Sequence, residues 1–488
     1  MIIHDWQITR QRITDKAILG VFVLVSTCAW SSVFIKWTNP ALPPARELGM
    51  SDLVLSYDAP SQLTQAARKQ GYRVYVEVLP QHAEAAATKA EAEGGAGIIL
   101  SVRQSERAQT RNVLAALRSA HPKLRFFVLN PDAKQPEMRG SLVIKRDAVL
   151  EVSSPTAQPW IDSNLALVRV EQAADGGQIP MYSFSWNPPV AAQPAKTITA
   201  ADYSLAVAEG GAFHADLILE LDAGLQKALT ERDPQAWTIW KQVQSYTEFY
   251  SHPTQTGLQA AADVVVVVDD LDPSDEAMNL MARHNIPFKV SLPTGLQSED
   301  MVGVDVVVVF AKPEKEFAIQ LERLASQGKT VVVVDAHGSY PWQTQGAVQL
   351  NEHTVSYAVG SGKVLDLSEP VSDPETFAQD IRRLIGNQNA LMSLWNGLTT
   401  IAVPYREKRG GLKTVELINY AQDPVRVQVK VKGSFTAIRY ENPEHGCCRS
   451  LAPTQHDGFT EFVIPDLTIA GRVHLENPPA IGSGKEHQ

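Results

Sequence analysis

Residues 73–102 read RVYVEVLPQHAEAAATKAEAEGGAGIILSV, and this stretch decides the fold of the first half of the chain. Two apolar runs, Arg73–Leu79 and Gly97–Val102, flank an alanine-rich segment, Gln81–Glu93, whose composition favours a helix. A strand, a helix and a second strand in this order are typical of parallel strands joined by a covering helix.

The same unit recurs from Ser32 to about Ser251. The apolar runs are Ser32–Trp37, Asp52–Tyr57, Arg73–Leu79, Gly97–Val102, Leu124–Leu129, Ala148–Val152, Ile179–Trp186 and Asp216–Leu221. Eight such units over residues 32–251 predict a (β/α)8 TIM barrel. Gln70-Gly71 before the third run predicts a helix C-terminus, and Gly210-Gly211 before the eighth predicts another.

A second region, residues 252–390, contains β-branched runs without alternation, of which Val264–Val268 and Val306–Phe310 are the clearest. Strands buried on both faces have this pattern. Helical segments such as Glu314–Ser326 lie between them, which predicts a flavodoxin-like doubly wound domain. Residues 391–477 alternate polar and apolar positions between turns and predict a β-sandwich. Residues 478–488 are polar and predict a disordered tail.

The N-terminal residues 1–31 predict an export signal. Ala17–Ile35 carries no charge, and three basic residues between positions 10 and 16 precede it. This is the pattern of a signal peptide, with cleavage expected after Ser31, and it predicts a periplasmic or extracellular protein. An uncleaved membrane anchor is the alternative, because nineteen uncharged residues nearly span a bilayer.

Composition narrows the class of protein. The chain has 488 residues, which suggests two to four domains. With 44 basic and 54 acidic residues the formal net charge is −10, which argues against nucleic acid as a partner. The three cysteines have no zinc-site spacing, and for the adjacent Cys447 and Cys448 free thiols are favoured over a ring disulfide. We predict no metal and no cofactor, since Walker and dinucleotide-binding motifs are absent from the sequence.

The order of barrel, doubly wound domain and β-sandwich resembles glycoside hydrolase family 42 β-galactosidases. The local likeness lies in Gln320–Val331, a helix, glycine and strand, and in the following Tyr357–Val364. The resemblance implies a glycosidase architecture, a carbohydrate partner and oligomerisation through the middle domain. It departs at the catalytic positions, because the fourth run ends in Leu100–Glu106 without the Asn-Glu pair of that family.

Barrel active sites form at the carboxyl ends of the strands, so acidic residues there are the candidates. They are Glu77, Asp132, Glu151 and Glu220. Glycoside hydrolysis needs two carboxyl groups, one protonated and one ionised. The alternative for Glu77 and Glu151 is a structural ion pair with Arg73, Lys145 or Arg146.

Four further residues are candidates for substrate binding. Trp37 and Trp186 are the last residues of the first and seventh runs and suit sugar stacking, whereas Lys36 and Asn187 suit hydrogen bonds to hydroxyls. Core packing is an equal alternative for Trp186. The sequence therefore predicts an exported glycoside hydrolase-like enzyme acting on an oligo- or polysaccharide. Its alternative is a catalytically silent carbohydrate-binding or envelope scaffold protein, because the Asn-Glu pair is missing.

Overall fold

The structure is a computed structural model. It describes residues 32–477 except 103–106, 131–144, 147–150, 153–160, 162, 176–178, 184–197, 252–256, 272, 297–300, 345, 409 and 422. The predicted export signal and the C-terminal tail therefore lie outside the described residues. No helix within the described ranges has the length and hydropathy needed to span a membrane.

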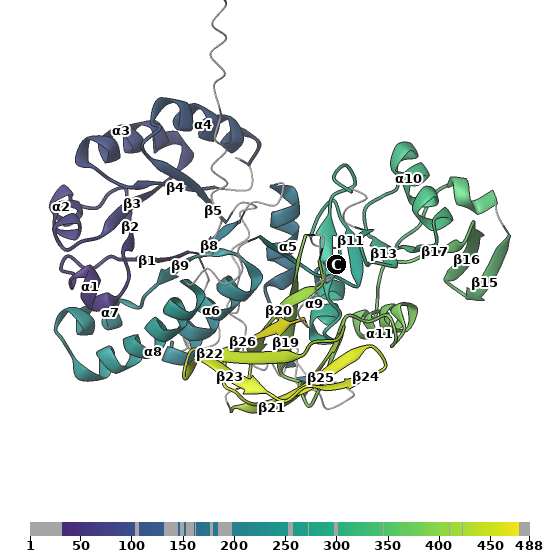
Figure 1. Ribbon diagram of the computed structural model, residues 1–488. Helices are drawn as coiled ribbons and strands as arrows, with labels where there is room; N and C mark the ends of the chain where they lie inside the picture. The colour runs from purple at the N-terminus through teal and green to yellow at the C-terminus, as the bar shows by residue number, and fades with distance from the viewer. Residues whose placement is uncertain are drawn as a thin grey trace, which may run out of the picture.

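Among the described residues, the first region forms a closed parallel barrel of seven strands (Figure 1). The strands, in their order around the barrel, are β1 (Val33–Lys36), β2 (Asp52–Ser56), β3 (Arg73–Val78), β4 (Gly97–Ser101), β5 (Arg125–Leu129), β8 (Met181–Ser183) and β9 (Asp216–Glu220). The helices of this region are α1 (Ala45–Leu48), α2 (Ser61–Lys69), α3 (Ala83–Glu93), α4 (Arg107–Ala120), α5 (Leu165–Ala174), α6 (Ala200–Phe213), α7 (Ala223–Thr230) and α8 (Pro234–Ser251).

The described residues close the barrel with seven strands rather than the predicted eight, and the described part of the sixth run lies outside the barrel sheet. The structure pairs β5 directly with β8, through Leu129 and Met181. Glu151–Val152 of the sixth run forms β7, which pairs antiparallel with β6 (Lys145–Arg146) in a separate two-stranded sheet. The run is short and carries a charge, whereas parallel barrel strands need a nearly continuous apolar run.

The two predicted helix ends have different outcomes. Helix α2 ends at Lys69 with Gln70 as its C-cap, and Gly71 has a φ of 94°, as the sequence predicted. Gly210 and Gly211 instead lie within α6, which continues to Phe213. A side chain at Gly211 would meet the Tyr250 ring at 2.1 Å, so this glycine allows α6 to pack closely on α8.

The middle region is a seven-stranded sheet with helices on both faces. Its strands, in spatial order, are β12 (Phe288–Ser291), β11 (Val264–Val267), β13 (Val306–Val309), β14 (Thr330–Val333), β17 (Gly362–Leu367), β16 (Thr354–Val359) and β15 (Ala347–Asn351). The first five strands pair in parallel, whereas β16 pairs antiparallel with both β17 and β15. Helices α9 (Asp275–Arg283) and α11 (Pro374–Ile385) share one core, and α10 (Lys315–Ser326) belongs to the core of the other face.

The last region consists of two antiparallel sheets that enclose a common core. The larger sheet has the order β10 (Leu258–Ala260), β19 (Thr400–Glu407), β20 (Leu412–Asn419), β26 (Ala470–Glu476), β22 (Ala437–Asn442) and β23 (Gly446–Leu451). The smaller has the order β18 (Met392–Trp395), β21 (Val425–Lys432), β25 (Phe459–Leu467) and β24 (Thr454–His456). Strand β10 precedes the middle sheet in sequence but pairs with β19.

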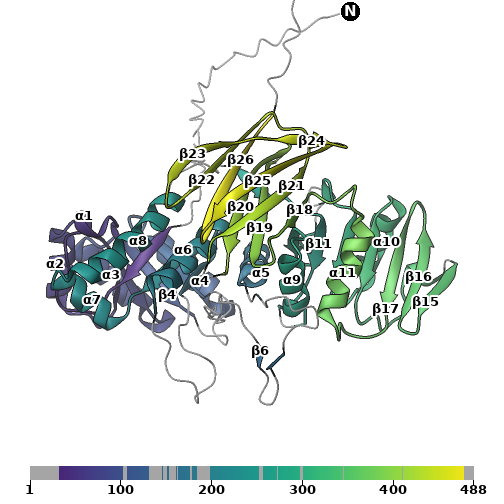
Figure 2. The same ribbon diagram turned by 90° about the horizontal axis from the view of Figure 1, so that it is seen from below.

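One continuous core joins the three regions. It includes residues of the barrel helices, of α9 and α11, and of β19 and β20. Tyr405 donates its hydroxyl hydrogen to the carbonyl of Ala212 at 2.6 Å, which links β19 to α6. Figure 2 shows the two antiparallel sheets lying across the junction between the barrel and the middle region.

Candidate functional site at the barrel mouth

The barrel interior is built in layers, because alternate residues of each strand point inward. A central apolar layer consists of Phe34, Val54, Tyr75, Ile99, Leu129, Met181 and Ile218. The rings of Phe34, Tyr75 and Phe127 meet edge to face with centroids 5.0–5.8 Å apart. These side chains fill the barrel, so a substrate has access only to its ends.

A polar layer lies one step beyond the apolar layer, at the carboxyl ends of the strands. Two residues after six of the apolar positions stand Lys36, Ser56, Glu77, Ser101, Ser183 and Glu220. We call this set the mouth layer. Since the strands are parallel, these residues lie toward one end of the barrel. Lys36 pairs with Glu220 and Ser56 with Glu77 on neighbouring strands, whereas the register is staggered elsewhere, as in the pairing of Glu77 with Ile99.

Lys36 joins the two glutamates of the mouth layer. Its Nζ lies 2.9 Å from Glu77 Oε2 and 2.8 Å from Glu220 Oε1. Since both oxygens contact one nitrogen, they lie no more than about 6 Å apart. Ser101 donates its hydroxyl hydrogen to Glu77 Oε1 at 2.8 Å. The side chains of Lys36, Glu77 and Glu220 are 24%, 19% and 36% exposed, so part of each side chain reaches solvent.

The charge of Lys36 is stabilised by its two partners. Burial lowers the pKa of Lys36, but the hydrogen bond to Glu220 and the negative charge of Glu77 outweigh this effect, so its pKa lies above the ordinary value. The lysine is therefore a cation held between two acidic groups.

The predicted site residues divide into three groups. Lys36, Glu77 and Glu220 come together in the mouth layer. Glu151 lies in β7, outside the barrel sheet, and its predicted place at the end of a barrel strand is wrong. Asp132, Trp186 and Asn187 lie outside the described residues.

Trp37 does not serve as a sugar platform in this structure. Its side chain is 1% exposed within the main core, and its indole nitrogen donates to the carbonyl of Ala41 at 3.0 Å. The ring lies on the helix side of β1, because Lys36 beside it points into the barrel and successive side chains alternate. The prediction that Trp37 stacks on substrate is therefore wrong.

Sequence reasoning missed the three serines of the mouth layer, Ser56, Ser101 and Ser183. The signal was present, since each stands two residues beyond an apolar interior residue and so shares its direction. The expected structural partners of Glu77 were also wrong. Its cation is Lys36 from a strand two positions away, rather than Arg73 of its own strand.

The cysteines give the described chain its one cluster of three metal-ligating groups, formed by Glu441, Cys447 and Cys448. The two sulfurs are joined in a disulfide, so neither is available as a thiolate. The expectation of free thiols is therefore wrong.

Comparisons with known proteins give structural matches alone. No family profile matches the chain, and no curated protein matches its sequence. The α-L-fucosidase isoenzyme 2 from Paenibacillus thiaminolyticus is 11% identical, with a TM-score of 0.57 over 92% of this chain and 100% of the other. The β-galactosidase from Rahnella sp. R3 is 8% identical, with a TM-score of 0.53 over 91% and 99%.

A β-galactosidase from Bacillus circulans sp. alkalophilus is 11% identical and has a TM-score of 0.51 over 92% of this chain and 99% of the other. These likenesses extend through all three regions rather than the barrel alone. At sequence identities of 8–11%, these matches show similarity of fold alone. The chain therefore shares the fold of this fucosidase and these β-galactosidases, with the order of regions that the sequence predicted.

Proposed function

We propose that this protein is a glycoside hydrolase-like enzyme that cleaves an oligo- or polysaccharide at the mouth layer, with Glu77 and Glu220 as its carboxylate pair. The observation that carries the proposal is the approach of these two glutamates to one Lys36 Nζ at the accessible end of a barrel. Catalytic groups of barrel enzymes gather at this end.

The spacing of the pair suits a retaining reaction. Retaining glycosidases hold their carboxyl groups about 5–5.5 Å apart and inverting ones about 6.5–9.5 Å apart. The upper limit of about 6 Å between Glu77 Oε2 and Glu220 Oε1 lies below the inverting range. We assign Glu77, which also accepts from Ser101, as the nucleophile and Glu220 as the acid that protonates the leaving oxygen.

Lys36 favours a second candidate function, the catalytically silent carbohydrate-binding protein. The Lys36 ammonium contacts an oxygen of each glutamate, whereas hydrolysis needs one carboxyl group to reach and protonate the leaving oxygen. The hydrolase proposal therefore requires substrate to displace the ammonium from Glu220. In the silent protein Lys36 stays in place, and the three charged groups bind sugar hydroxyls without cleaving a bond.

We also propose the limits and classes of the domains as 32–251 for the barrel, 252–390 for a flavodoxin-like domain and 391–477 for a β-sandwich. The parallel strands of the middle sheet run in the order β12-β11-β13-β14-β17, which is 2-1-3-4-5 in chain order and supports the flavodoxin-like class. The resemblance to family 42 further supports oligomerisation through this domain. A monomer in light scattering would contradict that part.

Export is part of the proposal. The basic and apolar pattern of residues 1–31 supports a signal peptide, with a membrane anchor as the alternative. The Cys447–Cys448 disulfide agrees with an oxidising compartment. Mass spectrometry of the protein from its native cell envelope tests cleavage after Ser31, and an intact N-terminus in the membrane fraction would favour the anchor.

The decisive experiment compares wild type with Glu77→Gln and Glu220→Gln on a panel of aryl glycosides and polysaccharides, by release of reducing ends. Glu231→Gln is the control, since Glu231 is 63% exposed and pairs only at 3.8 Å with Lys227. If wild type and Glu231→Gln release reducing ends and both mouth variants do not, the result supports the hydrolase proposal. Full activity in both mouth variants would contradict it. Binding without release would favour the silent protein.

A further inference from the structure

A second candidate site, with no barrel residue in its lining, lies in a cavity of about 780 Å³ between the middle region and the smaller antiparallel sheet. Its wall is formed by the end of α9, by α11 and the loop after it, by β18 and the following loop, and by single residues of β21 and β25. Its volume is within the range of small-ligand sites.

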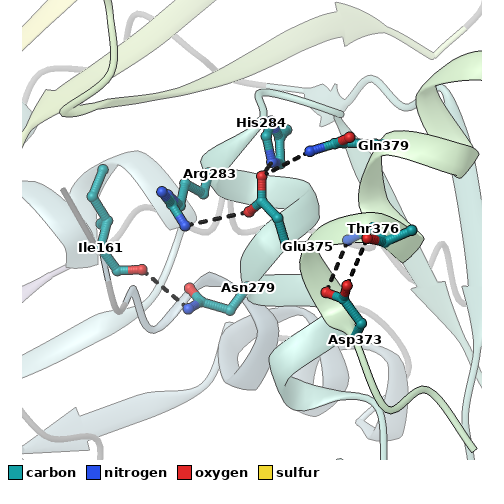
Figure 3. A network of polar contacts seen from close by, with 8 residues as sticks. All are labelled: Ile161, Asn279, Arg283, His284, Asp373, Glu375, Thr376 and Gln379. Carbon is teal, nitrogen blue, oxygen red and sulfur yellow. Dashed lines mark hydrogen bonds and ion pairs between the residues drawn. The ribbon is translucent and has the colours of Figure 1, made fainter. Parts of the chain in front are cut away.

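The cavity lining carries positive charge. It includes Arg283, Arg382 and Lys430, and no carboxylate is among the described residues that line it. This is unusual in a chain whose net charge is −10. The acidic partners, Glu375 of Arg283 and Glu461 of Lys430, contact these cations from outside the lining (Figure 3 shows the first).

Arg382 adds a cation that is paired with neutral groups. Its guanidinium donates to the carbonyls of His284 and Asn285 at 2.9 and 2.8 Å and to that of Met392 at 3.4 Å. Burial lowers the pKa of Arg382, and the nearby charge of Asp263 opposes this effect. The wall beside Arg382 therefore presents a charge that an anionic ligand would stabilise.

Lys430 supplies a cation that reaches solvent. Its ammonium lies 4.4 Å from the centroid of the Phe459 ring and 3.8 Å from Glu461 Oε1, the outer limit for an ion pair. An ammonium has three hydrogens to donate, so this geometry leaves donor capacity toward the cavity.

The rim of the cavity holds an exposed aromatic ring. In β18, Met392 and Leu394 face the sandwich core, whereas Ser393 and Trp395 face outward. Trp395 is 73% exposed and Leu398, three residues on, is 54% exposed. Both side chains line the cavity, so they offer apolar surface to a ligand there.

We propose that this cavity binds an acidic saccharide unit, such as a uronic acid. Trp395 packs on the apolar C–H face of the sugar ring, Lys430 binds the carboxylate, and the amides of Asn387 and Asn396 lie in reach of hydroxyls. The choice of a carbohydrate rests on the proposed function. The preference for an anion rests on the charge of the cavity itself.

Calorimetric titration of the full chain with tetragalacturonate and with neutral cellotetraose tests this inference. We expect the uronate to bind at least about tenfold more tightly than the neutral sugar, the loss expected for a hydrogen bond to a charged group. Trp395→Ala and Lys430→Met should each weaken uronate binding by about tenfold or more. Equal affinity for both sugars, or no uronate binding, would overturn the proposal.

Two controls match these variants. Lys432→Met removes a cation from the same strand that does not line the cavity, and Leu350→Ala removes another exposed apolar side chain. Both should bind uronate within about twofold of wild type, and unchanged binding in Trp395→Ala and Lys430→Met would overturn the site. Glu77→Gln should keep cavity binding, so failure here and failure of the proposed hydrolysis are distinguishable.

Discussion

The two ends of the barrel carry similar residues in different arrangements. At the amino end, Arg73 pairs with Asp52 at 2.5 Å, and Asp216 accepts from the backbone nitrogen of Ser32 at 2.6 Å. At the carboxyl end, one cation, Lys36, serves two glutamates that solvent reaches. The same alternation of side chains produces both ends.

Burial and the ratio of acids to cations distinguish structural from functional charged groups in this barrel. At the amino end, each acid has its own partner, and Asp52 and Asp216 are buried. At the carboxyl end, acids exceed cations among the described residues, and the groups stay accessible. An excess of acid beside one movable cation suits an incoming ligand, whereas matched buried groups suit stability.

The largest expected effect is the loss of hydrolysis when an amide replaces a glutamate at the carboxyl end of the barrel. Glu77→Gln should lower hydrolysis by about 10²- to 10⁴-fold, because a catalytic carboxylate is lost. Asp52→Asn makes the same kind of change at the amino end of the barrel and keeps the shape of the side chain. It should leave turnover within about twofold of wild type. Steady-state kinetics on one aryl glycoside measure both, and equal losses at the two ends would erase the distinction between them.

The apolar layer between the ends should dominate stability. Phe34 is fully buried and packs on Tyr75 and Phe127. Phe34→Ala should cost about 3–5 kcal/mol of unfolding free energy, because a cavity opens at the centre of the barrel. Urea unfolding followed by tryptophan fluorescence measures the loss. Phe34→Leu, which keeps much of the volume, should cost clearly less, and equal costs would contradict tight packing here.

A smaller effect should appear as pH dependence at the amino end. Burial raises the pKa of Asp216 to about 7, so the folded protein holds a proton that the unfolded chain releases above about pH 4. Stability should therefore fall as pH rises from about 4 to 7, by on the order of a few kcal/mol from this group. Asp216→Asn should flatten that part of the pH–stability curve. An identical slope in wild type and variant would contradict the raised pKa.

The smallest effect should come from the Asp52–Arg73 pair. Arg73 is more than half exposed, so solvent screens its charge. The double variant Asp52→Asn/Arg73→Gln replaces the ion pair with two amides and should change stability by less than about 1 kcal/mol. Thermal unfolding measures this change. A larger loss would show that the amino end depends on ionic pairing more than on its hydrogen bonds.

Local sequence pattern predicts most of the strands, because buried parallel strands need apolar, β-branched runs. Seven of the eight predicted runs became barrel strands. The prediction for the sixth run failed because β5 pairs directly with β8. Which strands become neighbours depends on how the whole barrel closes, and no single run shows this. Gly210 and Gly211 were misassigned for a similar reason, since their role is contact with Tyr250 and β9.

The residue types of the candidate site could be predicted from the sequence, but the ion pairs among them could not. Glu77, Glu220 and Lys36 could be selected because they end strands, but the bridge between them depends on the register of β1, β3 and β9. Trp37 was misjudged because its strand position allowed either direction. The buried neighbour Phe34, three residues before it, places it on the opposite side of β1.

Binding of saccharide at the mouth layer underlies both proposed functions. Carbodiimide labelling of carboxyl groups, read by mass spectrometry with and without the saccharide that the panel identifies, tests it most directly. The account predicts that the saccharide protects Glu77 and Glu220 from labelling and leaves Asp52 and Glu231 unchanged. Unprotected Glu77 and Glu220 at saturating saccharide would contradict it.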